Sequence, residues 1–154
     1  GDWPVESVQT MARIATETEE QLKYETAVSK AKSHTPATSG VISRAACNAA
    51  NELKAAAIVS STKSGATARR ISQCRPECPI VAVTPSEKVA KSLAFCFGVY
   101  PVVAEDQNST DAMMANATKI AVENGFANSG DTVVIAAGLD QVGSTNLLKV
   151  SVVE

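Results

Sequence analysis

The sequence is poor in aromatic residues and has a single histidine and no long apolar segment. Aromatic side chains make up 4% of its 154 residues, so the core would consist mainly of Ala, Val, Ile and Leu. No apolar run approaches the roughly 20 residues that span a bilayer, and no basic-then-apolar signal sequence begins the chain. We therefore expect a soluble, cytoplasmic domain with no membrane partner.

Positive charge is not in excess. The chain has 14 Lys and Arg residues against 16 Asp and Glu residues, for a formal charge of −2. Nonspecific nucleic-acid binding needs a basic surface that displaces counterions from phosphates, so we expect no nucleic-acid partner. The 45% hydrophobic and 19% charged residues are instead typical of one globular domain of this length.

The cysteines lack the spacing of a metal or redox site. Cys74 and Cys78 do not form a C-x-x-C pair, and His34 is the only histidine, so no set of zinc ligands is evident. Cys47 and Cys96 lie in apolar segments, where a thiol behaves as a small hydrophobe. We expect reduced, structural cysteines and no metal site.

The periodicity of apolar residues changes along the chain. It predicts helices over residues 4–22 and 37–53, a polar connector between them, and then alternating strands and helices. Strands are predicted over residues 56–59, 79–83, 99–103, 132–136 and 147–153, and helices over 66–74, 84–95 and 109–124. Such alternation favours right-handed crossovers and a parallel sheet covered on both faces. The link 138–146 is too short for a parallel crossover, so the last strand should be antiparallel.

These elements predict an α/β fold. It is a three-layer α/β/α sandwich, with a mixed five-stranded sheet that is mainly parallel. Ligands in such sheets bind beyond the carboxyl ends of the strands.

The turn after the first strand holds the strongest candidates for binding. Its residues are Thr62, Lys63, Ser64, Gly65 and Thr67. They offer hydroxyls, a lysine and a glycine that lets the backbone approach a ligand, and they lead into a helix N-terminus that favours phosphate. The order of residues is not that of a Walker A loop. As an alternative, Ser64 and Thr67 would only cap the helix.

A second candidate is the loop between the last two strands, with Gly138, Asp140, Gln141 and Gly143. A simple hairpin connection is the alternative, and the residues themselves favour it. His34 has no evident nucleophile partner, and no Gly-x-Ser-x-Gly elbow is present. We therefore assign no catalytic residue, and the residues favour a ligand-binding domain over a complete enzyme.

Several strings resemble one enzyme family, in the family's order. They are ISRAA (42–46), TKSGATAR (62–69), RP (75–76), PIVAVTP (79–85), GVYPV (98–102), GDTVV (130–134) and GSTNLLKV (143–150). Together they resemble the C-terminal domain of pyruvate kinase, and GDWPVE (1–6) resembles the segment after the last strand of that family's catalytic barrel. The resemblance implies three parts: a terminal helix of the barrel domain in 1–23, a connector in 24–36 and the C-terminal domain in 37–154.

The resemblance implies a glycolytic activity for the longer protein. Pyruvate kinases transfer a phosphoryl group from phosphoenolpyruvate to ADP, with Mg²⁺ and usually K⁺. Their catalytic groups lie in domains that would precede Gly1. We therefore expect this chain to be a piece of a longer protein, inactive alone and without a cofactor of its own.

The resemblance also implies regulation and assembly. Many members bind a phosphorylated sugar or nucleotide effector on loops that match Thr62–Thr67 and Gly138–Gly143. Here the second loop is shorter and lacks Arg or Lys, and Ala66 stands where arginine is frequent, which favours a monophosphate or no effector over a bisphosphate. The family is usually homotetrameric, and the open edge of the last strand, Leu147–Val153, is suited to pairing with its copy. The alternative is a purely structural assembly module with no effector.

Overall fold

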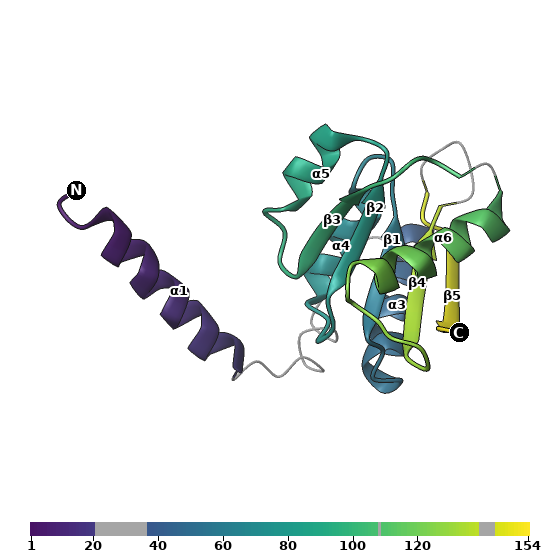
Figure 1. The fold of residues 1–154 in the computed structure, drawn as a ribbon, viewed down its shortest axis with the longest axis horizontal. Helices are drawn as coiled ribbons and strands as arrows, with labels where there is room; N and C mark the ends of the chain where they lie inside the picture. The colour runs from purple at the N-terminus through teal and green to yellow at the C-terminus, as the bar shows by residue number, and fades with distance from the viewer. Residues whose placement is uncertain (21–36, 108, 139–143) are drawn as a thin grey trace.

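A computed structural model describes residues 1–20, 37–107, 109–138 and 144–154 (Figure 1). Helix α1 (Pro4–Glu20) begins at the predicted residue, and all of its residues are exposed. The predicted end of this helix and the connector 24–36 lie outside the described residues. No helix in the described part of the chain is long and apolar enough to cross a membrane.

The other elements alternate between helix and strand. They are α3 (Thr38–Glu52), β1 (Ala57–Ser61), α4 (Ala66–Cys74), β2 (Ile80–Thr84), α5 (Glu87–Leu93), β3 (Val99–Val103), α6 (Thr110–Glu123), β4 (Thr132–Ala137) and β5 (Leu147–Val152). The strands form one sheet in the order β3-β2-β1-β4-β5. Strands β1 to β4 are parallel, and β5 is antiparallel to β4. The predicted fold is therefore confirmed.

Two apolar cores lie on opposite faces of the sheet. Ile58 and Ile80 pack with α3, α4 and α5, whereas Val59 and Val81 pack with α6. All four side chains are fully buried. Because both faces are covered, β1 and β2 are nearly continuous apolar runs rather than alternating ones. The layers leave the carboxyl ends of the parallel strands together at one edge of the sheet.

Serine residues lie where β1 ends and where α5 and α6 begin, close to the carboxyl ends of the parallel strands. β1 continues to Ser61, two residues beyond the predicted 56–59, because Ser60 and Ser61 pair through their backbones with both β2 and β4. Ser86 and Ser109 are the N-caps of α5 and α6, since their hydroxyls accept hydrogen bonds from the backbone N–H groups three residues on. The helix predicted over 84–95 is therefore shorter at both ends, Glu87–Leu93.

Candidate functional site

The loop between β1 and α4 is held by a tight turn. Thr62 Oγ1 accepts a hydrogen bond from the Gly65 N–H at 3.0 Å. Gly65 has φ +80°, and a Cβ there would lie 2.9 Å from Arg69 Nη1 and 3.1 Å from Leu93 Cδ2. The left-handed backbone favours glycine, and a Cβ would also crowd the Leu93 side chain. The turn fixes where the loop residues point and where α4 begins.

Ser64 and Thr67 do not act as caps of α4. The N-cap is Gly65, which has no side chain to supply a hydrogen bond. The Ser64 carbonyl accepts a hydrogen bond from Arg69 Nη1 at 3.0 Å, and the Thr67 hydroxyl lies 2.6 Å from the Thr145 hydroxyl. The alternative of simple helix capping is therefore wrong, and the first amides of α4 receive no side-chain cap from these residues.

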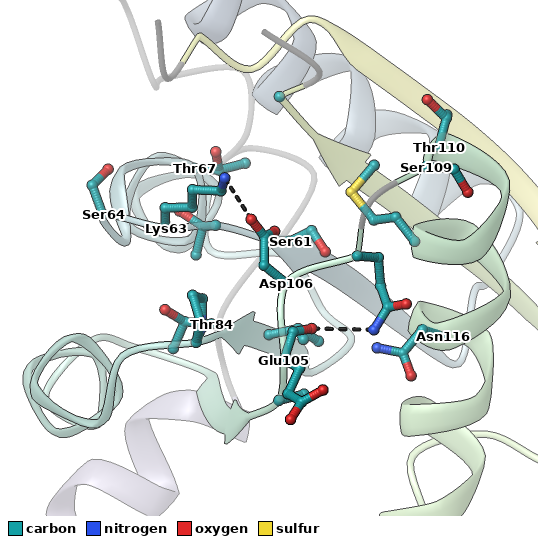
Figure 2. A pocket seen from close by; sticks show the side chains of 17 residues that line it. Ser61, Lys63, Ser64, Thr67, Thr84, Glu105, Asp106, Ser109, Thr110 and Asn116 are labelled. Atoms are coloured by element: carbon teal, nitrogen blue, oxygen red, sulfur yellow. Dashed lines mark hydrogen bonds and ion pairs between the residues drawn. The ribbon is translucent and has the colours of Figure 1, made fainter. Parts of the chain in front are cut away.

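A cavity of about 340 Å³ opens at the carboxyl ends of β1, β2 and β3 (Figure 2). The loop after β1, the end of β2, the segment after β3, and the first turns of α6 contribute to its walls. Of the predicted residues, Thr62, Lys63, Ser64, Thr67 and Gly138 line it. The structure thus brings residues from both predicted loops to one cavity.

The remaining predicted residues have other positions. Gly65 is buried and shapes the loop without lining the cavity. Asp140, Gln141 and Gly143 lie outside the described residues.

Acidic residues of the segment after β3 were missed by the sequence analysis. Glu105 and Asp106 line the cavity, and Asp106 Oδ2 lies 2.5 Å from Lys63 Nζ. Their position just beyond the carboxyl end of a predicted strand could have identified them as candidates.

Thr145 belongs to the candidate loop between the last two strands, but its pairing with Thr67 was not predicted. Its hydroxyl and that of Thr67 bond to each other across 78 residues of sequence, and the two residues are 1% and 5% exposed. Thr145 lies two residues before β5, where the backbone is closely packed: the Asn146 N–H donates to the Ala137 carbonyl at 3.1 Å. A Cβ on Gly138 would lie 2.5 Å from the Ser144 carbonyl oxygen. The start of α4 is therefore joined directly to the start of the edge strand.

The four cysteines are free thiols, and Cys47 and Cys74 are buried. A hydrogen bond between these two thiols, together with burial, raises the pKa of Cys47, and the same bond lowers the pKa of Cys74. Burial raises the pKa of Cys78 to about 11. The described residues include no group of three His, Cys, Asp or Glu side chains that could hold a metal ion.

Alkylation of Cys78 should be slow in the folded chain and should accelerate with pH. With a pKa of about 11, only a small thiolate fraction exists at pH 8. An unfolded cysteine, with a pKa of about 8.5, has a thiolate fraction roughly 100-fold larger or more. We expect iodoacetamide to label Cys78 about 100-fold more slowly in buffer than in urea, as followed by peptide mass spectrometry. Equal rates in the two conditions would contradict the burial of this thiol.

The fold and the cavity define a class of protein: a three-layer α/β/α domain with a polar cavity at the carboxyl ends of its parallel strands, where open α/β sheets bind ligands. Residues 40–151 match the model of the family described as pyruvate kinase, alpha/beta domain. The chain belongs to this family.

Relatives at high identity carry the same family name. The chain is 45% identical to a pyruvate kinase of Clostridium acetobutylicum over 157 aligned positions, which cover 100% of the chain and 33% of that protein. It is 40% identical to pyruvate kinases of Sporosarcina psychrophila and Bacillus licheniformis, with 99% of the chain and 27% and 26% of those proteins covered. The chain therefore spans a third or less of the length of these curated relatives.

Proposed function

We propose that this domain binds a phosphorylated sugar or nucleotide in the cavity at the carboxyl ends of β1, β2 and β3. The observation that carries the proposal is the loop Thr62–Thr67, whose lysine and hydroxyls line the cavity where α4 begins. The first N–H groups of a helix have no intrahelical partner, and with the helix dipole they favour a phosphate. Lys63 adds a positive charge at the same place. The family resemblance supports the same position for an effector phosphate.

We further propose that the whole protein is a glycolytic pyruvate kinase that this domain regulates. It would transfer a phosphoryl group from phosphoenolpyruvate to ADP, in domains outside this chain. An effector that binds one arrangement of the subunits more tightly than another increases the population of the arrangement that it prefers. The Mg²⁺ and K⁺ that the resemblance implies would act with the catalytic groups of those domains.

Self-association through β5 is the second part of the proposed function. β5 is an edge strand, and Val150 and Val152 are 41% and 59% exposed. An open, apolar edge is a template for pairing with another strand, and the equivalent strand of a second copy is the partner that two-fold symmetry supplies. In the full-length protein we propose a homotetramer. Sedimentation of the chain tests the pairing, and a monomer at all concentrations would contradict it.

The alternative is an assembly module that binds no effector. The ion pair between Lys63 and Asp106 favours this alternative, because the lysine of the loop already has an anionic partner. Binding measurements distinguish the two functions.

Calorimetric titration of the chain with ribose 5-phosphate, glucose 6-phosphate, fructose 1,6-bisphosphate and AMP tests the proposed binding. We expect saturable binding of at least one of them, weakened about tenfold by Lys63→Ala because a charged contact to phosphate is lost. Lys119→Ala is the matched control, since Lys119 is also exposed and paired with a carboxylate but lies outside the cavity. If none of the four binds the folded chain, the assembly module is the better account.

A further inference from the structure

The segment after β3 gives the cavity an acidic wall (Figure 2). Asp106 extends from this segment to Lys63, so the ion pair joins the loop after β1 to the segment after β3. Glu105 also lines the cavity, and its carboxylate points away from Lys63. Lys63 is the only Lys or Arg among the described lining residues, which include two carboxylates, Glu105 and Asp106.

No second cation lines this wall among the residues that the structure describes. Arg69 lies beside the loop, but its Nη1 donates to the Ser64 carbonyl and its Nη2 to the Ser92 hydroxyl at 2.8 Å. Only one phosphate of a ligand would therefore find a positively charged partner here.

We propose that Glu105 and Asp106 make the cavity selective for a metabolite with one phosphate and a neutral, hydroxyl-rich remainder. The proposal rests on the proposed function, in which the phosphate occupies the Thr62–Thr67 loop. Ionised carboxylates accept hydrogen bonds from hydroxyl groups, so they suit the polyol part of a sugar. A second phosphate would meet like charge in the same small cavity, and like charge is an effective way to reject a competing ligand.

Asp106 has a further effect as a competitor for Lys63. A ligand phosphate that binds Lys63 has to replace Asp106, which is then available to accept a hydrogen bond from a ligand hydroxyl. The side chains of Lys63 and Asp106 are 76% and 53% exposed. Exposed ion pairs of this kind are weak, so the competition should alter phosphate affinity only a few-fold.

The test compares three probes on the full chain: inorganic phosphate, ribose 5-phosphate and fructose 1,6-bisphosphate. We expect the unmodified chain to bind ribose 5-phosphate more tightly than fructose 1,6-bisphosphate. Asp106→Asn should tighten binding of inorganic phosphate about 2- to 5-fold and of the bisphosphate about tenfold. It should leave ribose 5-phosphate nearly unchanged, because the gain at Lys63 offsets the weaker hydroxyl acceptor.

Two further variants separate the roles of the charges. Glu105→Gln should tighten binding of the bisphosphate without changing that of inorganic phosphate, because Glu105 does not pair with Lys63. Asp111→Asn is the matched control: it removes one exposed carboxylate from the first turn of α6, outside the cavity lining. If Asp111→Asn tightened binding of the bisphosphate as much as Glu105→Gln, the cause would be the overall charge of the chain and not the carboxylates that line the cavity. That result would overturn the proposal.

Failure of the inference and failure of the proposed function give different results. If the unmodified chain prefers the bisphosphate, or if Asp106→Asn leaves the ratio of the two sugar phosphate affinities unchanged, the selectivity proposal is wrong and the site stands. If none of the three probes binds the unmodified chain or any variant, the proposed function is wrong and the selectivity proposal falls with it.

Discussion

Alanine in place of Gly138 is expected to lower the free energy of unfolding by about 2–3 kcal/mol. The added Cβ would lie 2.5 Å from the backbone carbonyl oxygen of Ser144, a distance that non-bonded carbon and oxygen do not tolerate. Backbone on both sides of the loop would have to move, against the hydrogen bond between Asn146 and Ala137. Since Gly138 also lines the cavity, ligand affinity should fall with stability. Urea unfolding followed by circular dichroism measures the first effect.

Gly130→Ala is the control for this prediction. Gly130 has φ +89° but nothing within 4 Å of an added Cβ, so its substitution carries only the cost of the left-handed backbone, about 1 kcal/mol. The close approach at Gly138 would be refuted if Gly138→Ala were no more destabilising than Gly130→Ala.

Removal of one hydroxyl from the buried pair of Thr67 and Thr145 should also be costly. Each of Thr67→Val and Thr145→Val leaves the other hydroxyl without its partner, at about 1–3 kcal/mol of unfolding free energy. The double variant removes both groups, so its loss should be well below the sum of the two single losses. Chemical denaturation of the four proteins gives this coupling directly.

The same variants separate structure from binding. Thr67 lines the cavity and Thr145 does not, so Thr67→Val should weaken phosphate binding more than Thr145→Val does. Ser64→Ala, at an exposed lining residue, is the control with little effect on stability. Additive stability losses at 67 and 145 would count against the hydrogen bond.

The fold was largely predictable because local signals agree with the tertiary structure. α4 (Ala66–Cys74) and β3 (Val99–Val103) have the predicted bounds at both ends. For α4 the reason is physical: Gly65 adopts the left-handed backbone at its start, and Arg75 adopts it at its end. β1 was placed too early because Ser60 and Ser61 are polar, whereas the ladder that holds them uses only backbone groups.

The candidate site was predictable only in part. The loop Thr62–Thr67 stands out locally, since hydroxyls, a lysine and a glycine precede a helix. The partners of Lys63 and Thr67 are Asp106 and Thr145, which are far away in the sequence. No local sequence pattern links these pairs. The strand order in the sheet brings the two members of each pair together. The alternative in which Thr67 only caps α4 was wrong for the same reason, because its hydroxyl pairs with Thr145.

The most direct test of phosphate binding at the Thr62–Thr67 loop is a two-dimensional ¹H–¹⁵N NMR titration of the chain with ribose 5-phosphate. We expect saturable shifts of the amides of Gly65, Ala66 and Thr67, at the start of α4. The amides at the C-terminal end of α6, near Asn124, lie outside the cavity lining, so they should stay unchanged and serve as an internal control. Saturable shifts confined to other parts of the chain, or no shifts at all, would contradict the account.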